Sequence, residues 1–205
     1  FCGYHGWHDW YLAANLGTEN ALGKHLMLGL APHGVPAGLK GTSFPFRYNH
    51  IEELEAIAAK HRNDMSAIVM EPVRSEQPSP GFLERVRAIA DETGAVFIID
   101  EISAGFRMNS GGAHLLLGVT PDIAVFSKAM GNGFPIAAVI GKGEIMNAAQ
   151  NTFISSTMWS ERTGPAAALA TINKHKRLNA GEHLMTIGKM VQEGWRKLSS
   201  QNGLN

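Results

Sequence analysis

The sequence predicts an α/β fold in which a parallel sheet lies between two layers of helices, a three-layer α/β/α sandwich. The first observation is a set of short apolar runs bounded by turn residues: AIVME at 67–71, AVFIID at 95–100 and IAVF at 123–126. Such runs are typical of strands buried on both faces of a parallel sheet. The second is a helical spacing of apolar residues between the first two runs, as in a strand–helix–strand unit. The third is size, because 205 residues with 44% hydrophobic content can bury a sizeable core.

Charge and composition exclude several kinds of partner. The chain has 18 Lys and Arg against 18 Asp and Glu, with no run of basic residues, so neither nucleic acid nor an anionic membrane surface is expected to bind. The single cysteine, Cys2, excludes an internal disulfide framework, and no apolar segment approaches the length of a membrane span. We therefore expect a reducing, cytoplasmic setting and a small-molecule or protein partner. Because Phe1 rather than Met opens the chain, we also expect a fragment, truncated at both ends.

The N-terminal part of the chain predicts an irregular region and then a helix. Residues 1–48 are rich in Gly and Pro and show no clean period, which indicates loops. Asn49, with Glu52 three residues later, fits an N-cap that opens a helix ending near His61. The apolar residues of that helix fall on one face: Ile51, Leu54, Ile57 and Ala58.

A strand–helix–strand unit follows. Ser79 and Pro80 fit the cap and first turn of a helix that ends at Gly94. This helix carries an apolar stripe: Phe82, Leu83, Val86, Ile89 and Ala90. Because a strand, a crossover helix and a second strand make a parallel pair, Glu71 and Asp100 are expected at the same edge of the sheet.

The C-terminal part predicts one more strand and three helices. The turn GNGFP at 131–135 leads into the apolar strand 136–141 and a short helix over about 144–150. A polar run follows, and the Ala-rich residues 166–176 predict the next helix. A last helix ends before Asn202 and carries apolar residues at helical spacing: Leu184, Ile187, Val191, Trp195 and Leu198.

An acid and an amine stand where two of the strands stop. Asp100 ends the run VFIID, and Lys128 follows the run IAVF. In open α/β sheets the ligand crevice lies outside the carboxyl ends of the strands, so both side chains are expected to face one crevice. A plainer interpretation stays open: a lysine at a strand end is ordinarily a solvated terminator, and Asp100 with Glu101 could cap a following turn.

Five motifs carry a resemblance to a known family. They are YHGWHD at 4–9, EP at 71–72, DEISAGFR at 100–107, PDIAVFSKAMGNGFPIAAVIG at 121–141 and the segment around Thr157. In order and spacing they resemble the class III pyridoxal-phosphate-dependent aminotransferases, most closely the glutamate-1-semialdehyde 2,1-aminomutase branch. The resemblance implies the large domain of PLP-dependent transferase fold type I. It assigns residues 1–175 to the cofactor-binding domain, without its N-terminal part, and residues 176–205 to a helix leading toward a C-terminal small domain.

The resemblance also implies roles around the cofactor pyridoxal 5'-phosphate (PLP), which serves as an electron sink. Lys128 is expected to form the resting Schiff base and then to move a proton between substrate and cofactor carbons. Asp100 is expected to hydrogen-bond the pyridine nitrogen and favour its protonated form. Ile102 is expected to pack on one face of the ring and Tyr4, with His5 beside it, on the other.

Two further residues complete the expected site. Thr157 resembles the residue that reaches the phosphate of a neighbouring subunit, which implies a homodimer with a shared active site. Glu71 resembles the family carboxylate on the substrate side. The implied function is transfer of an amino group from a small-molecule donor to an aldehyde or keto acceptor, while intramolecular transfer of the aminomutase type stays open.

Other interpretations also stay open. VFIIDE fits the Walker B strand of a nucleotide hydrolase, in which the Asp holds magnesium and the Glu positions water, although no GxxxxGKS or GxxxxGKT motif is present. The chain could also be a catalytically silent fragment. His5, His8 and Asp9 can ligate a metal, but their spacing matches no metal motif, so no metal is expected. Arg74 and Arg107 could bind a substrate carboxylate or form surface ion pairs.

Overall fold

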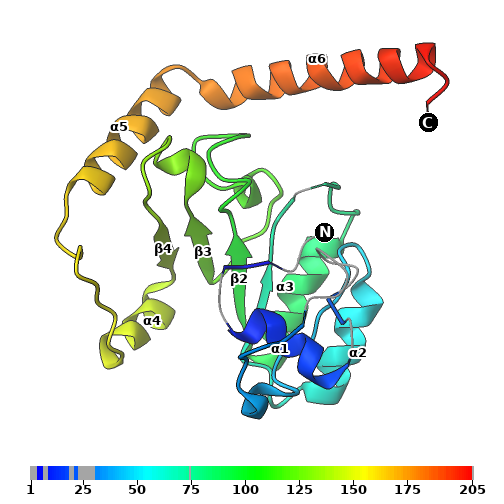
Figure 1. The fold of residues 1–205 in the computed structure, drawn as a ribbon, viewed down its shortest axis with the longest axis vertical. Coiled ribbons are helices and arrows are strands. Elements are labelled where there is room, and N and C mark those ends of the chain that lie inside the picture. Colours follow the sequence, from blue (N-terminus) through cyan, green and yellow to red (C-terminus); the bar gives the residue numbers. More distant parts are fainter. Residues whose placement is uncertain (1–3, 7–8, 19–20, 23–30, 74, 205) are drawn as a thin grey trace. The chain divides into compact units, whose positions relative to one another are not determined.

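The computed structural model describes residues 4–6, 9–18, 21–22, 31–73 and 75–204. The strands are β1 (Ala67–Met70), β2 (Val96–Asp100), β3 (Ile123–Phe126) and β4 (Ala138–Gly141), which form one mixed sheet in that order (Figure 1). A helix connects β1 to β2, whereas only short 3-10 turns and loops connect β2 to β3 and β3 to β4. The predicted α/β fold is confirmed, but the sheet is mixed and not all-parallel as predicted.

The chain divides into two compact units. Unit 1 consists of residues 1–100 and 119–123, and unit 2 consists of residues 101–118 and 124–205. The chain therefore passes from one unit to the other directly after Asp100.

Unit 1 is built on the predicted strand–helix–strand motif. Its crossover helix is α3 (Phe82–Thr93), and β1 and β2 pair in parallel with Met70 opposite Ile99. Gly94 ends α3 in a left-handed conformation (φ 73°), which a residue without Cβ adopts at little cost. The predicted apolar stripe is buried in full: Phe82, Leu83, Val86, Ile89 and Ala90.

Both predicted helix caps in unit 1 are wrong. Helix α2 (Ile51–His61), which packs against α3, begins after His50, and Asn49 takes a left-handed conformation (φ 63°) (Figure 1). The Asn49 side chain accepts a hydrogen bond from the Ser79 backbone N–H (2.8 Å) and donates one to the Gln77 carbonyl (3.0 Å). The Ser79 carbonyl in turn accepts from the Phe82 N–H (3.0 Å). These residues therefore tie two helix starts together instead of capping either.

The structure corrects two other expectations about unit 1. Helix α1 (Asp9–Gly17) lies in the segment predicted to be irregular, which also holds the short 3-10 helix Ala37–Leu39. The α1 sequence DWYLAANLG is apolar on most sides, so it shows no amphipathic period. In β1, burial alternates and Val69 is 36% exposed, so this strand is not buried on both faces as predicted.

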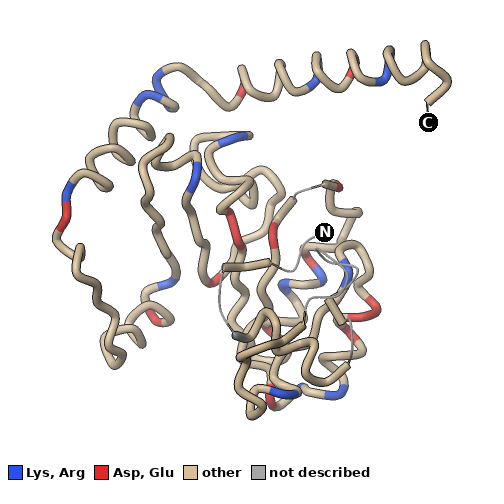
Figure 2. The backbone as a smooth tube through the Cα atoms, viewed as in Figure 1, with Lys and Arg blue, Asp and Glu red and all other residues tan. Residues whose placement is uncertain are grey.

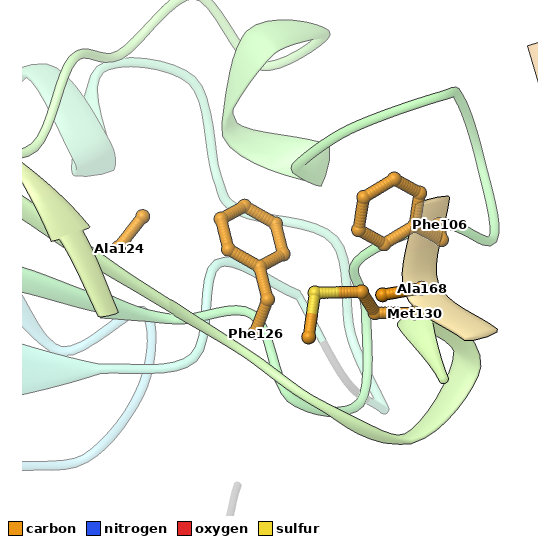
Figure 3. Packing of buried hydrophobic residues seen from close by; sticks show 5 residues of the cluster. All are labelled: Phe106, Ala124, Phe126, Met130 and Ala168. Atoms are coloured by element: carbon orange, nitrogen blue, oxygen red, sulfur yellow. The ribbon is translucent and has the colours of Figure 1, made fainter. Parts of the chain in front are cut away.

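Unit 2 packs around a small aromatic core. The cluster consists of buried side chains from the turn after β2, from β3 and the 3-10 turn after it, and from α5 (Thr163–Arg177): Phe106, Ala124, Phe126, Met130 and Ala168 (Figure 3). The Phe106 and Phe126 rings lie 5.6 Å apart between centroids. This packing fixes the end of β3 and the 3-10 turn Lys128–Met130 that follows it.

The remaining elements of unit 2 match the predicted positions. A short helix α4 (Gly143–Met146) continues into a 3-10 turn over Asn147–Asn151, and α5 is followed by α6 (Ala180–Gln201). Basic and acidic residues are interspersed along α6 (Figure 2), while its apolar residues, such as Trp195, stay exposed. Within the described parts of the chain, none of the helices combines the length and apolar character needed to cross a membrane.

Candidate active site

Two carboxylates stand at the ends of β1 and β2. Glu71 directly follows β1, and Asp100 is the last residue of β2. Because Met70 pairs with Ile99, the next register position brings Glu71 opposite Asp100. Both residues are buried, with 8% and 6% of their surface exposed. The prediction that these two acids lie at the same edge of the sheet is confirmed.

The structure brings His5 to Asp100 across 95 positions of sequence. The His5 Nδ1 atom lies 2.9 Å from the Asp100 Oδ2 atom, a hydrogen bond that orients the carboxylate. Tyr4, the neighbouring residue, packs edge-on against Tyr11 of α1 with 5.6 Å between the ring centroids. Tyr4 is 46% exposed, so part of its surface can still contact a ligand.

A third acid, Asp122, supports β2, and the sequence analysis missed it. Its Oδ2 atom accepts hydrogen bonds from the Phe97 N–H (2.8 Å) and from Arg87 Nη1 (2.9 Å). Burial alone would lower the pKa of the Arg87 guanidinium, but its hydrogen bonds to Asp122 and Asp91 raise it. No local signal marked Asp122, because its burial and its partners become visible only in the folded chain.

Lys128 follows β3 in unit 2 and has a strained backbone. Its φ is 45°, in the left-handed region that costs a residue with a Cβ roughly 1–2 kcal/mol. The side chain is exposed, and its Nζ donates a hydrogen bond to Ser103 Oγ (2.8 Å). Ser127, just before it, donates from Oγ to the Ile136 carbonyl (2.7 Å). Strain of this kind concentrates at functional sites, where the surrounding structure holds it in place.

Glu101 has a structural role that the sequence analysis gave only as a capping possibility for the Asp-Glu pair. It is completely buried, and its carboxylate accepts hydrogen bonds from the backbone N–H groups of Ala113 and His114, both at 2.9 Å. The His114 ring nitrogen Nδ1 also lies 2.7 Å from Glu101 Oε1. Glu101 therefore anchors the turn that carries the half-buried Ile102 and Ser103.

Thr157 lies in the exposed segment between the 3-10 turn Asn147–Asn151 and α5. The segment exposes large apolar side chains: Phe153, Ile154, Met158 and Trp159. Just after it, hydrogen bonds from the side chain and backbone of Thr163 lower the pKa of Glu161.

The donor set fits the aldehyde and pyridine ring of PLP. An exposed lysine amine can form an imine with an aldehyde, and a buried carboxylate oriented by an imidazole can pair with a protonated ring nitrogen. The separation between the Lys128 amine and the Asp100 carboxylate stays a prediction. His8 and Arg74 lie outside the described residues, and within those residues no group of three His, Cys, Asp or Glu could hold a metal ion.

Comparison with known proteins gives consistent matches. Residues 3–204 match the family Aminotransferase class-III. The 3-aminobutyryl-CoA aminotransferase of Cloacimonas acidaminovorans (strain Evry) is 38% identical over 98% of this chain and 46% of its own length. The glutamate-1-semialdehyde 2,1-aminomutase of Ignicoccus hospitalis is 37% identical over 85% of this chain and 42% of its own length.

The solved structures agree. The FumI protein of Sphingopyxis sp. MTA144, in its PLP internal aldimine form, matches with a TM-score of 0.82 and 25% identity, over 98% of this chain and 46% of that one. The chain therefore spans about half the length of the proteins it matches.

Proposed function

The chain belongs to the class-III aminotransferase family, and from that premise we propose that it binds PLP through Lys128 and transfers an amino group. The substrates proposed are a small-molecule amino donor and an aldehyde or keto acceptor. Residues 1–175 would make up the cofactor-binding domain, and residues 176–205 would lead toward a small domain. A reducing, cytoplasmic setting belongs to the same proposal, supported by the single cysteine.

The observation that carries the proposal is the position of Lys128. Lys128 follows the end of β3 and has a left-handed backbone conformation. Its amine donates a hydrogen bond to Ser103, in the turn that follows Asp100 in the sequence. A solvated strand terminator needs neither the strained backbone nor the hydrogen bond. The family places its catalytic lysine in the motif that this segment resembles.

Each of the proposed site residues has a separate role around PLP, which supplies an electron sink when bound. The Lys128 amine would hold the cofactor through its aldehyde and, when free, would carry a proton between carbons. Asp100, oriented by His5, would pair with the ring nitrogen and favour its protonated form. Tyr4 and Ile102 would pack on the two faces of the ring.

A second candidate is intramolecular amino transfer of the aminomutase type. The 37% identity to a glutamate-1-semialdehyde 2,1-aminomutase favours it. Glu71, buried at the end of β1, is the proposed carboxylate on the substrate side in either reaction. Lys128 and Asp100 serve both reactions equally, so the two differ only in whether a separate amino donor is needed.

A homodimer with a shared active site is part of the proposal. Thr157 would donate a hydrogen bond to the phosphate bound in a second copy. The support is the exposed apolar segment around it, in which Phe153 is 97% exposed. Contiguous apolar surface of this kind is typical of interfaces.

Glu101 cannot play the role that the Walker B interpretation requires of it. In a nucleotide hydrolase the Glu after the strand must position water. Glu101 is fully buried, and its carboxylate already accepts hydrogen bonds from Ala113 and His114. The amino-transfer proposal has no such conflict.

Absorbance of the protein supplied with PLP tests the proposal. We expect a band near the violet edge of the visible spectrum, loss of that band when an amino donor is added, and its return with a keto or aldehyde acceptor. The Lys128→Ala variant should show none of these changes. Identical spectra for the two proteins would refute the proposal, and ATP-dependent phosphate release would support the rival. Turnover of an amino-aldehyde without any donor would favour the aminomutase reaction.

A further inference from the structure

We propose that Ser103 is a positioning residue for the Lys128 amine, an inference that rests on the proposed role of Lys128. The lysine Nζ donates to Ser103 Oγ at 2.8 Å. A neutral amine that donates an N–H group in this hydrogen bond keeps its lone pair, which is the part that attacks a carbonyl. Ser103 therefore orients the amine without blocking the lone pair.

The hydroxyl sits on a turn that is fixed before any ligand binds. At its start, the Glu101 backbone N–H donates to the Val125 carbonyl of β3 (2.8 Å), and the Glu101 carbonyl accepts from the Gly105 N–H (2.7 Å). Arg107 Nε donates to the Ser103 carbonyl (2.9 Å). The turn thus holds Ser103 by its own backbone and by an arginine side chain.

The same packing fixes both partners of the hydrogen bond. Gly105 lies so close to β3 that a Cβ there would be 2.7 Å from the Phe126 ring and 2.8 Å from the Glu101 carbonyl oxygen. Phe126 is the last residue of β3 and stands two positions before Lys128. Since the turn packs on the strand end that carries the lysine, the distance between the hydroxyl and the lysine backbone is set by the fold.

The hydrogen bond from Lys128 to Ser103 is expected to affect the rate at which Lys128 reacts with PLP. A lysine side chain has many rotamers, and most of them point the amine away from any one carbonyl. A hydrogen bond with a typical net strength raises the population of the held rotamer by about fivefold. Ser103→Ala should therefore slow covalent capture of PLP by Lys128 by about that factor, because the amine spends less time in position.

The test is the rate at which Lys128 is labelled by PLP and borohydride. After timed mixing and quenching with borohydride, mass spectrometry of peptides gives the label on Lys128 and, as an internal reference, on Lys60 and Lys189. Ser103→Ala should reduce the Lys128 rate about fivefold and leave the reference lysines unchanged. Ser103→Thr, which keeps the hydroxyl, should restore the rate to within about twofold.

Two controls separate a positioning role from a general loss of structure. Ser110→Ala removes a hydroxyl of the same unit, one that is hydrogen-bonded to His175 (2.7 Å), and should leave the Lys128 rate unchanged. Thermal unfolding shows whether Ser103→Ala and Ser103→Thr are equally folded. Equal Lys128 rates in wild type and Ser103→Ala, with the label still selective for Lys128, would overturn the Ser103 inference alone. A wild type that labels Lys128 no faster than the reference lysines would overturn the proposed function and this inference with it.

Discussion

Lys128 keeps a backbone conformation that few residues with a Cβ adopt, and this strain can be measured without any cofactor. Glycine takes a φ of 45° at almost no cost, whereas alanine carries the same Cβ clash as lysine. Lys128→Gly should therefore be more stable than Lys128→Ala by about 1 kcal/mol, in spite of glycine's larger entropy loss on folding. Denaturant unfolding of the two variants checks this. A more stable alanine variant would mean that the backbone there is not strained.

Asp100 is predicted to act on chemistry and not on folding. Asp100→Asn keeps the shape and a hydrogen-bond acceptor but removes the negative charge that favours a protonated ring nitrogen. We expect amino transfer to slow by on the order of a hundredfold, with little change in melting temperature. Rates of the donor half-reaction, followed by absorbance, measure this effect.

Asp122 is the matched control for Asp100, because both acids are buried, Asp100 ends β2 and Asp122 binds the Phe97 N–H of the same strand. Asp122→Asn weakens the hydrogen bond with Arg87, so it should cost about 1.5 kcal/mol of unfolding free energy and leave the half-reaction rate nearly intact. If Asp122→Asn slowed the chemistry as much as Asp100→Asn, the two acids would have no separate roles.

At the scale of elements, the turn after β2 depends on Glu101. Its carboxylate satisfies the N–H groups of Ala113 and His114, and its removal leaves both buried donors without that partner. Glu101→Ala should lower the free energy of unfolding by about 3 kcal/mol, measured by denaturant unfolding. The exposed Glu84→Ala on α3 should cost less than about 0.5 kcal/mol. Equal effects of the two substitutions would contradict the anchoring role.

The helices and strands were predictable because their signals are local and repeated. The apolar stripe of α3 fixes its buried face, and Gly94 fixes its end. The cap predictions were wrong because Asn49 and Ser79 hydrogen-bond to each other. The two residues are 30 positions apart, and no local motif encodes such a contact. Helix α1 was missed because its sequence is apolar on most sides and so has no period.

The site shows the same division between local and long-range information. Strand ends predicted that Glu71 and Asp100 share a sheet edge, and the pairing register bears this out. The roles of Asp122 and Glu101 depend on partners 25 and 12 residues away, at Phe97 and Ala113, and on burial, neither of which shows in a single sequence. Ser103 is similar, since its importance follows only from its contact with Lys128.

At the scale of the whole molecule, the proposed shared site predicts complementation between variants. Thr157→Ala should weaken PLP binding by about tenfold, since it removes a hydrogen bond to a charged group. Lys128→Ala should be inactive. In a heterodimer of the two variants, one site carries both substitutions and the other carries neither.

Mixing the two variants should therefore restore activity above the sum of the separate proteins. Sedimentation would show a dimer in each sample, and the Lys128→Ala/Thr157→Ala double variant mixed with itself serves as the control. Activity of the mixture equal to the sum would place Thr157 in the same subunit as the lysine it serves, or outside the site.

The central claim is that Lys128 and Asp100 act on opposite ends of one pyridine ring. A crystal structure of the protein with PLP measures this most directly. The account predicts continuous density between Lys128 Nζ and the cofactor, and an Asp100 oxygen at about 2.7–3.0 Å from the ring nitrogen. A cofactor bound to another lysine, or a ring nitrogen without Asp100 beside it, would contradict the account.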